Sequence, residues 1–168
     1  AQGADRGFAM GLMDRPLTDD SFFTALDDAR SAGLEIVFEV RKLAEPDHPN
    51  TVEIELTATD GATVELVARS IGGGEVEITR VDGRAVRFRG TAYEILAELP
   101  AAEENAARSL LAGSGTWLEE PVRSEDGGAV RLAGRRTAAL PEKLRNALLA
   151  LDGSARVWES EPVYFVQT

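Results

Sequence analysis

Apolar residues in the first 33 positions recur at the spacing of amphipathic helices. The first predicted helix has an apolar side within residues 8–13, a cap at Asp5 and an end at Pro16. A second helix is predicted to begin near Thr18-Asp19-Asp20, because the negative charge of the two aspartates is favourable at a helix N-terminus. Gly33 stands where a left-handed residue would end it. We therefore expect the chain to open with two helices.

From Thr51 the apolar period changes from 3.6 to 2, which is typical of strands with one solvated face. Turn signals at Asp60-Gly61 and Asp82-Gly83 predict β-hairpins. The strands expected in this part of the chain are residues 34–40, 51–57, 64–68 and 75–78. Their glutamates are predicted to form one solvated face rather than a metal or acid–base site: Glu53, Glu55, Glu75 and Glu77.

The second half of the chain alternates strand and helix patterns in the order βαββαβ, that of a ferredoxin-like unit. The predicted elements are a strand at 91–99, a helix at 103–111, strands at 116–123 and 129–135, a helix starting at Pro141 and a strand at 155–163. Trp117 and Trp158 fall in predicted strands, where we expect core or interface positions rather than stacking platforms.

These patterns predict an α+β fold in two parts. N-terminal helices with an antiparallel sheet occupy residues 1–86, and the βαββαβ unit occupies residues 87–168. The seam between the parts is expected within the short polar segment 82–90, so the two parts should pack together.

The amino-acid composition excludes several classes of function. Asp and Glu number 29 against 18 Lys and Arg, a net charge of −11, which argues against binding to nucleic acid or to an anionic membrane. The chain contains no cysteine and one histidine, which excludes thiolate catalysis, a cysteine-ligated metal centre and a histidine-rich metal site on these residues. No apolar run approaches the roughly 20 residues that cross a bilayer. We expect a cytoplasmic protein.

The segment Ser70-Ile71-Gly72-Gly73-Gly74 follows a predicted strand and is the most unusual local sequence. Three consecutive glycines lose more backbone entropy on folding than other residues would, so the segment needs a structural or functional explanation. They form either a turn between two strands or a loop whose N–H groups hold an anion such as a carboxylate. No Gly-Lys-Ser/Thr follows, so the segment is not a Walker loop.

Two further segments carry candidate binding groups. His48-Pro49-Asn50 precedes the first alternating strand; it reads as an exposed, Pro-stiffened loop, or as a site for His48 and Asn50. Asp5 and Arg6 open the first helix, where Arg6 could hold a carboxylate beside free helix N–H groups. The alternative is that Asp5 only caps the helix and that Arg6 faces solvent.

Taken in order, these three segments resemble the beta chain of the iron–sulfur-dependent L-serine dehydratases. Gly3-Ala4-Asp5-Arg6 is similar to the family's Gly-His-Gly-Thr-Asp-Arg segment. His48-Pro49-Asn50-Thr51 matches His-Pro-Asn-Thr, and Ser70–Gly74 followed by Glu77-Ile78 matches a Ser-Ile-Gly-Gly-Gly segment and its following strand. The resemblance covers roughly residues 1 to 85. A similar domain occurs in some phosphoglycerate dehydrogenases, but the triple glycine favours the dehydratases.

The chain departs from the family pattern in three places. Ala4 stands near the position of the family's histidine, and the segment is one residue shorter. The upstream Ser-Ser-Ser-His-Thr segment is absent, so the resemblance implies that the sequence starts partway through the family's domain. The second half has an ACT-like order of elements but lacks the usual Gly-Val-Ile loop and the Asn-Ile segment.

The resemblance implies a beta-type domain of the allosteric substrate-binding kind at residues 1–86 and an ACT-like domain at 87–168. It implies a subunit of an ammonia-lyase-type enzyme that removes water from L-serine or a related hydroxy amino acid. No cofactor is expected on this chain; a [4Fe-4S] cluster is expected on a cysteine-bearing alpha-like partner. The implied ligand-binding residues are Ser70, Gly72, Gly73, Gly74, His48, Asn50, Asp5 and Arg6, with no catalytic or metal-binding residue assigned.

A different class of function stays open: a non-catalytic regulatory module that binds a small amino acid or carboxylate as an effector. In both cases we expect a hetero-complex or a homodimer, because ferredoxin-like units expose sheet edges that are commonly paired or covered.

Overall fold

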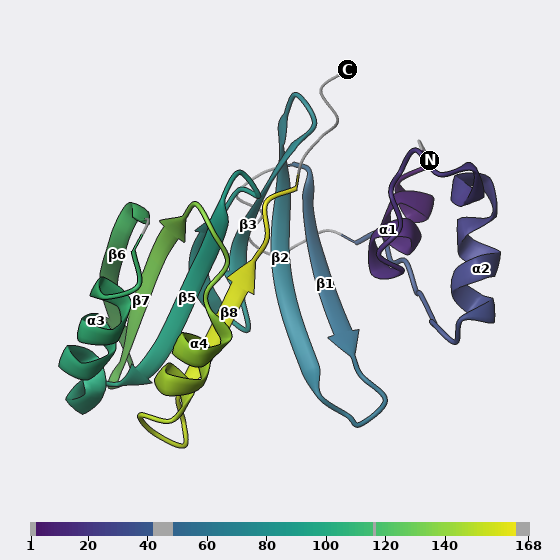
Figure 1. Cartoon of the computed structure of the whole chain (residues 1–168). Helices are drawn as coiled ribbons and strands as arrows, with labels where there is room; N and C mark the ends of the chain where they lie inside the picture. The colour runs from purple at the N-terminus through teal and green to yellow at the C-terminus, as the bar shows by residue number, and fades with distance from the viewer. Residues whose placement is uncertain (1–2, 42–48, 116, 164–168) are drawn as a thin grey trace. The chain divides into compact units, whose positions relative to one another are not determined.

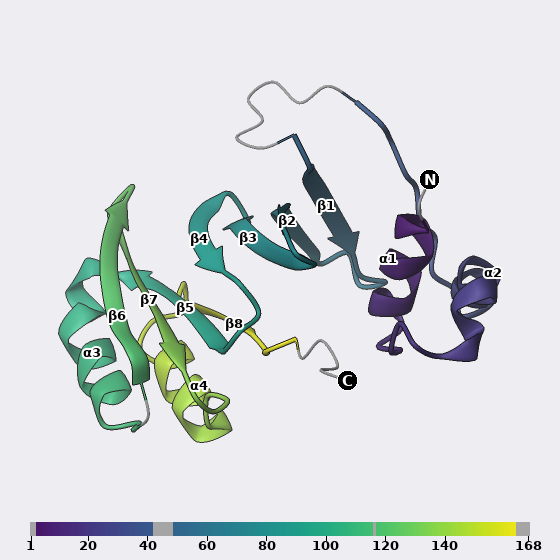
Figure 2. The same cartoon turned by 90° about the horizontal axis from the view of Figure 1, so that it is seen from above.

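A computed structural model describes residues 3–41, 49–115 and 117–163 (Figures 1 and 2). The chain forms two compact units, residues 1–45 and residues 46–168. The predicted boundary at residue 86 falls inside strand β4 (Arg84–Phe88) of the second unit, and a division into two domains there stays a prediction. No described helix has both the length and the apolar character needed to cross a membrane.

The first unit contains the two predicted helices, α1 (Ala4–Leu12) and α2 (Ala25–Ser31). Their small buried residues, among them Ala9 and Ala29, pack at the centre of the unit. Gly33 ends α2 with φ +83°, as predicted.

Three predictions for the first unit are wrong in detail. Asp5 does not cap α1: Gly3 occupies the cap position, and Asp5 lies in the first turn. The segment from Asp20 to Thr24 is a 3₁₀ helix, with the Asp19 carboxylate accepting the backbone N–H of Ser21 at its start, and α2 begins only at Ala25. Residues 34–40 form no strand, since β-type composition yields a strand only where a neighbouring strand can pair with it.

The first sheet of the second unit is an antiparallel meander in the order β1-β2-β3-β4. It comprises β1 (Thr51–Thr57), β2 (Thr63–Gly72), β3 (Glu75–Val81) and β4. The hairpin turns at Asp60-Gly61 and Asp82-Gly83 lie where the sequence predicts them, with both glycines at positive φ. The alternating pattern is thus confirmed as a four-stranded sheet of sequential hairpins.

The second sheet has the order β6-β7-β5-β8, with every neighbouring pair antiparallel. Its elements are β5 (Tyr93–Pro100), α3 (Glu104–Ala112), β6 (Trp117–Asp126), β7 (Ala129–Arg136), α4 (Glu142–Leu149) and β8 (Arg156–Ser160). This connectivity and strand order confirm the predicted βαββαβ unit of ferredoxin-like type. Of the predicted strand 116–123, Thr116 lies outside the described residues.

Helices α3 and α4 cover one face of the second sheet, where Ala107, Leu111 and Leu148 pack against apolar residues of β5 and β7 (Figure 1). Trp117 on β6 packs against this core, as expected for a structural tryptophan. Gly134 on β7 makes that packing possible: a Cβ there would lie 2.7 Å from the Trp117 ring. A larger residue would push the indole out of place.

The face of the second sheet that α3 and α4 do not cover packs against strands β3 and β4 of the first sheet. Leu96 of β5 is buried with Val81 of β3 and Phe88 of β4, and Trp158 of β8 packs at the same cluster. Trp158 also donates its indole N–H to the Asp82 carboxylate at 3.2 Å. The two sheets of the second unit therefore share a core, and the polar residues around it form the site described next.

Candidate functional site

Two of the three sequence segments singled out above meet at one end of the β1–β2 ladder. The backbone carbonyl of Asn50 accepts the N–H of Ser70 at 3.2 Å, one step beyond the pair Thr51 and Arg69. The structure therefore places the Pro49-Asn50 turn beside the start of the glycine-rich segment. His48 lies outside the described residues.

The triple glycine closes the hairpin between β2 and β3: Gly72 is the last residue of β2, and Gly73 and Gly74 form the turn. Gly72, Gly73 and Gly74 all have positive φ, at 98°, 64° and 84°, which other residues adopt only with strain. The turn is exposed, and no atom lies within 4 Å of a Cβ built on any of the three. The backbone requirement accounts for the glycines, and the open tip leaves room for a ligand or a partner on the outside.

Asp5 and Arg6 lie on α1 in the first unit, whereas Asn50 and Ser70 lie in the second unit. The Arg6 guanidinium lies over the Phe23 ring, 5.9 Å from its centre. That contact is compatible with the solvent-facing reading of Arg6, and it leaves the carboxylate-holding reading as a prediction.

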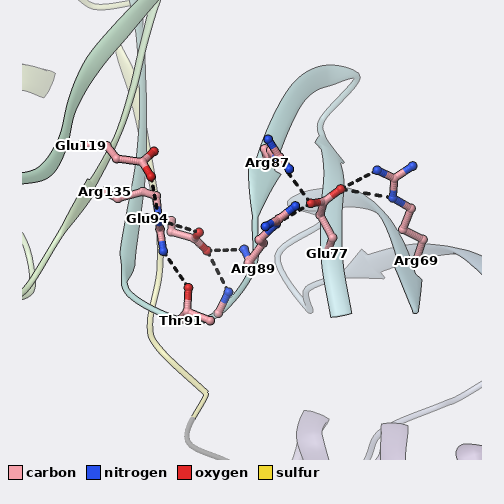
Figure 3. Close-up of polar contacts among 9 residues, drawn as sticks. Arg69, Glu77, Arg87, Arg89, Thr91, Glu94, Glu119 and Arg135 are labelled. Atoms are coloured by element: carbon pink, nitrogen blue, oxygen red, sulfur yellow. Dashed lines mark hydrogen bonds and ion pairs between the residues drawn. The ribbon is translucent and has the colours of Figure 1, made fainter. Parts of the chain in front are cut away.

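A buried charge cluster adjoins the glycine-rich segment, and sequence reasoning missed it. Glu77, predicted on a solvated face, is only 2% exposed. Its carboxylate accepts hydrogen bonds from Arg69 at 2.6 Å and from Arg89 at 2.7 Å, and a longer one from Arg87 at 3.2 Å (Figure 3). The hydrogen bond from Arg89, with those from Arg69 and Arg87, outweighs burial and lowers the pKa of Glu77 from 4.5 to about 2.

A second buried carboxylate lies beside the first cluster. Glu94 on β5 is 1% exposed, and its Oε2 accepts the backbone N–H groups of Arg89 at 2.6 Å and Gly90 at 2.9 Å. Its Oε1 lies 3.5 Å from Nε of Arg135, and neither atom has a hydrogen-bond partner among the residues that the structure describes. Arg135 in turn donates to Glu119 and to Thr91, both at 2.7 Å (Figure 3).

A third cluster of charged residues connects the two sheets. Glu98 on β5 accepts hydrogen bonds from Arg84 of β4 at 2.7 and 2.8 Å and from Arg131 of β7 at 2.8 Å. Chiefly through Arg84, this lowers the pKa of Glu98 from 4.5 to about 2. The Arg84 guanidinium also lies over the Trp158 ring.

These clusters are suited to binding charged groups rather than to proton transfer. A general acid or base works best with a pKa near the working pH, whereas Glu77 and Glu98 are held fully ionised at neutral pH. In the described part of the chain, no three His, Cys, Asp or Glu residues are placed to hold a metal ion. The alternation of Arg87, near the end of β4, and Arg89, just after it, was the available sequence signal for the arginine cluster.

Comparison with known proteins adds two relatives. The chain is 30% identical to the L-serine dehydratase beta chain of Peptoniphilus asaccharolyticus over 154 residues, which is 89% of this chain and 69% of that protein. It is 38% identical to the probable L-serine dehydratase beta chain of Bacillus subtilis (strain 168) over 94 residues, 56% of this chain and 42% of that protein. No profile of an established protein family matches the chain.

Proposed function

The chain belongs to the family of L-serine dehydratase beta chains, and from this premise we propose that it acts as the beta-type subunit of a dehydratase. The observation that carries the proposal is a match to a protein of that name over 89% of the chain. The order of the three sequence segments, from Asp5-Arg6 to Ser70–Gly74, agrees with this match.

The proposed reaction is the elimination of water from L-serine or a related hydroxy amino acid. Loss of the β-hydroxyl and an α-proton, together one water, gives an enamine, which tautomerises to an imine. Water then adds to the imine carbon and ammonia leaves, which gives a 2-oxo acid. Serine would give pyruvate, and threonine would give 2-oxobutyrate.

The residues of this chain do not fit an iron–sulfur cluster. Cluster irons are held by cysteine thiolates, and the 168 residues include no cysteine. The proposal therefore places a [4Fe-4S] cluster on a separate, cysteine-bearing alpha-like subunit. This chain would contribute an interface and groups that bind the amino acid.

The proposed ligand-binding groups are the glycine turn with Ser70, Asn50 and His48, together with Asp5 and Arg6. The turn is exposed, and no atom of the described residues lies within 4 Å of a Cβ built on any of its glycines. A carboxylate bound there would need further contacts on its other side. In the proposal the alpha-like partner supplies these contacts, so the turn would bind the amino acid only in the assembled enzyme.

The second candidate function is an effector-binding regulatory module. It is favoured by the βαββαβ unit, whose order of elements is that of ACT-like domains. Its outer strands, β6 and β8, are sheet edges that a second copy or a partner could cover.

Co-purification with a cysteine-bearing alpha-like subunit, which the proposal expects to be encoded near this chain, tests the two functions. Under anaerobic conditions, we expect 2-oxo acid formation from L-serine or L-threonine by the complex, and neither iron binding nor turnover by this chain alone. Turnover by the lone chain at the rate of the complex would contradict the subunit proposal. A complex in which this chain only changes the response of an independently active partner to an amino acid would support the regulatory module instead.

A further inference from the structure

Residues 34–40 of the first unit follow α2 and run past α1 without joining a sheet (Figure 1). Alternate side chains of this segment pack on the two helices: Leu34, Ile36 and Phe38, whose ring lies 6.1 Å from that of Phe8. The side chains between them are exposed: Glu35, Val37 and Glu39. This alternation is that of a strand with one covered face.

The backbone of the segment is unpaired. The N–H of Leu34 donates to the Ala29 carbonyl at 2.9 Å. From residue 35 to residue 40, no backbone group is hydrogen-bonded to another of the residues that the structure describes. Free N–H and C=O groups beside strand-like side chains are what an open sheet edge presents. Such an edge binds an extended chain by taking it up as a further strand.

Space for an added strand lies beside the segment. A hollow of about 610 Å³ is lined by residues 33–38 together with Leu26 and Arg30 of α2. Two apolar side chains of its wall are open to solvent, Val37 at 74% and Phe38 at 50% exposure. An added strand would cover these apolar groups and pair the free backbone at the same time.

A second copy of the segment does not fit this edge. When all seven residues pair with their counterparts, an antiparallel arrangement places Glu35 opposite Glu39, and a parallel one places each glutamate opposite itself. Like charges directly opposite each other destabilise a strand pair. The net charge of −11 on the chain adds repulsion between two copies at longer range.

The two glutamates instead define the strand that would fit. Both are exposed, and neither forms an ion pair with another of the described residues. They flank Val37 on the exposed face, so the matching positions of an added strand are basic, apolar and basic, since opposite charges across a strand pair are favourable. The covered face, which packs on the helices, calls for apolar side chains.

We infer that residues 34–40 are the edge to which the alpha-like subunit adds an extended strand, with lysine or arginine opposite Glu35 and Glu39 and an apolar residue opposite Val37. The inference rests on the proposed subunit function, because it assigns the surface on which that partner docks. This surface lies in the first unit, whereas the glycine turn lies in the second.

Hydrogen exchange of the full 168-residue chain, alone and in complex with the alpha-like subunit, tests the pairing. In the free chain, the amides of residues 35–40 should exchange as fast as unstructured backbone, because no described group accepts them. In the complex, about every second of these amides should exchange at least tenfold more slowly, since neighbouring amides of a strand point to opposite edges. A complex in which none of them slows would overturn the inference. Protection in the free chain would also overturn it, because this chain or a second copy would then cover the edge.

Charge reversal tests the chemistry of the added strand. Glu35→Lys combined with Glu39→Lys turns two attractive pairs into repulsive ones and should raise the Kd of the complex at least tenfold. The control, Glu55→Lys combined with Glu65→Lys, makes the same change of charge at exposed positions of β1 and β2 and should leave the Kd within threefold. Circular dichroism checks the helices of the free variants. If the edge variant loses them, Glu35→Gln with Glu39→Gln replaces it and should raise the Kd at least threefold.

The outcomes separate this inference from the proposed function. Equal weakening by the edge variant and the control would indicate unspecific charge attraction and overturn the docking edge. A complex that forms 2-oxo acid while residues 34–40 stay unprotected would also overturn it and leave the subunit proposal standing. A protected edge in a catalytically silent complex would support the edge and refute the dehydratase reaction. Absence of any complex would refute the subunit proposal and the docking edge together.

Discussion

Replacing Glu77 by glutamine removes the carboxylate on which Arg69, Arg87 and Arg89 converge. Glutamine keeps the size and one acceptor oxygen but loses the charge, so three guanidinium groups remain close together without a counter-ion. Breaking a buried ion pair by removing one partner costs more than the pair itself contributes, because it leaves an uncompensated charge. We expect Glu77→Gln to destabilise the second unit.

The magnitude follows from the pKa of Glu77, which falls from 4.5 to about 2. At about 1.4 kcal/mol per pKa unit, the ionised carboxylate stabilises the folded state by roughly 3 kcal/mol. This is an upper figure, since Arg87 and Arg89 are 71% and 42% exposed and solvent screens their share. Because the folded-state pKa is the lower one, the contribution is complete above pH 4.5 and is lost as the pH falls towards 2.

The assay is urea unfolding followed by tryptophan fluorescence. Trp117 and Trp158 are the two tryptophans of the chain, and both lie in the unit that contains Glu77. The control is Glu55→Gln, which removes an exposed glutamate of the same sheet. We expect a loss of about 2–3 kcal/mol for Glu77→Gln at pH 7 and within 0.5 kcal/mol for Glu55→Gln. Equal stability of the two variants, or a Glu77→Gln deficit that does not shrink below pH 4.5, would refute the reasoning.

Two glycine substitutions complete the predictions. Gly73→Ala places a side chain at φ +64° in an open turn, so we expect a cost of about 1 kcal/mol. In the complex with the alpha-like subunit, it should lower kcat/KM for serine at least tenfold; unchanged kcat/KM would leave the glycines as a turn only. Gly134→Ala puts a Cβ 2.7 Å from Trp117, which should cost about 1–3 kcal/mol and shift the tryptophan emission, and an unchanged spectrum would contradict the packing.

The element order of the second unit could be predicted because each element carries its own local signal. Turn residues such as Asp60-Gly61 and Asp82-Gly83 adopt the same hairpins in any context that pairs the flanking strands. The end of α2 at Gly33 likewise depends on one residue's backbone freedom. In contrast, residues 34–40 have the composition of a strand, and composition alone supplies no partner for their backbone groups.

The solvated face of the glutamates was predicted correctly for Glu53 and Glu55 but not for Glu77. On β3 the expected exposure is inverted: Val76 is 47% exposed and Glu77 is buried. Period 2 identifies two faces but not which of them the rest of the fold covers. The burial of Glu77 depends on Arg87 and Arg89. These residues contact Glu77 only when β3 and β4 are paired. The surroundings of Glu94 were unpredictable for the same reason, because they are formed by residues of four strands, β4, β5, β6 and β7.

The glycine turn and the arginine cluster depend on each other through the register of β2. Arg69 pairs with Glu77 across the ladder, and the register shifts between Ser70 and Gly72 just before the turn. A slip of one residue would send the Arg69 side chain to the other face and place Ser70 opposite Glu77. Only residues that accept positive φ close this turn in the observed register. The three glycines therefore position Arg69 as well as the turn itself, so a bulky substitution there should disturb both the turn and the buried charges around Glu77.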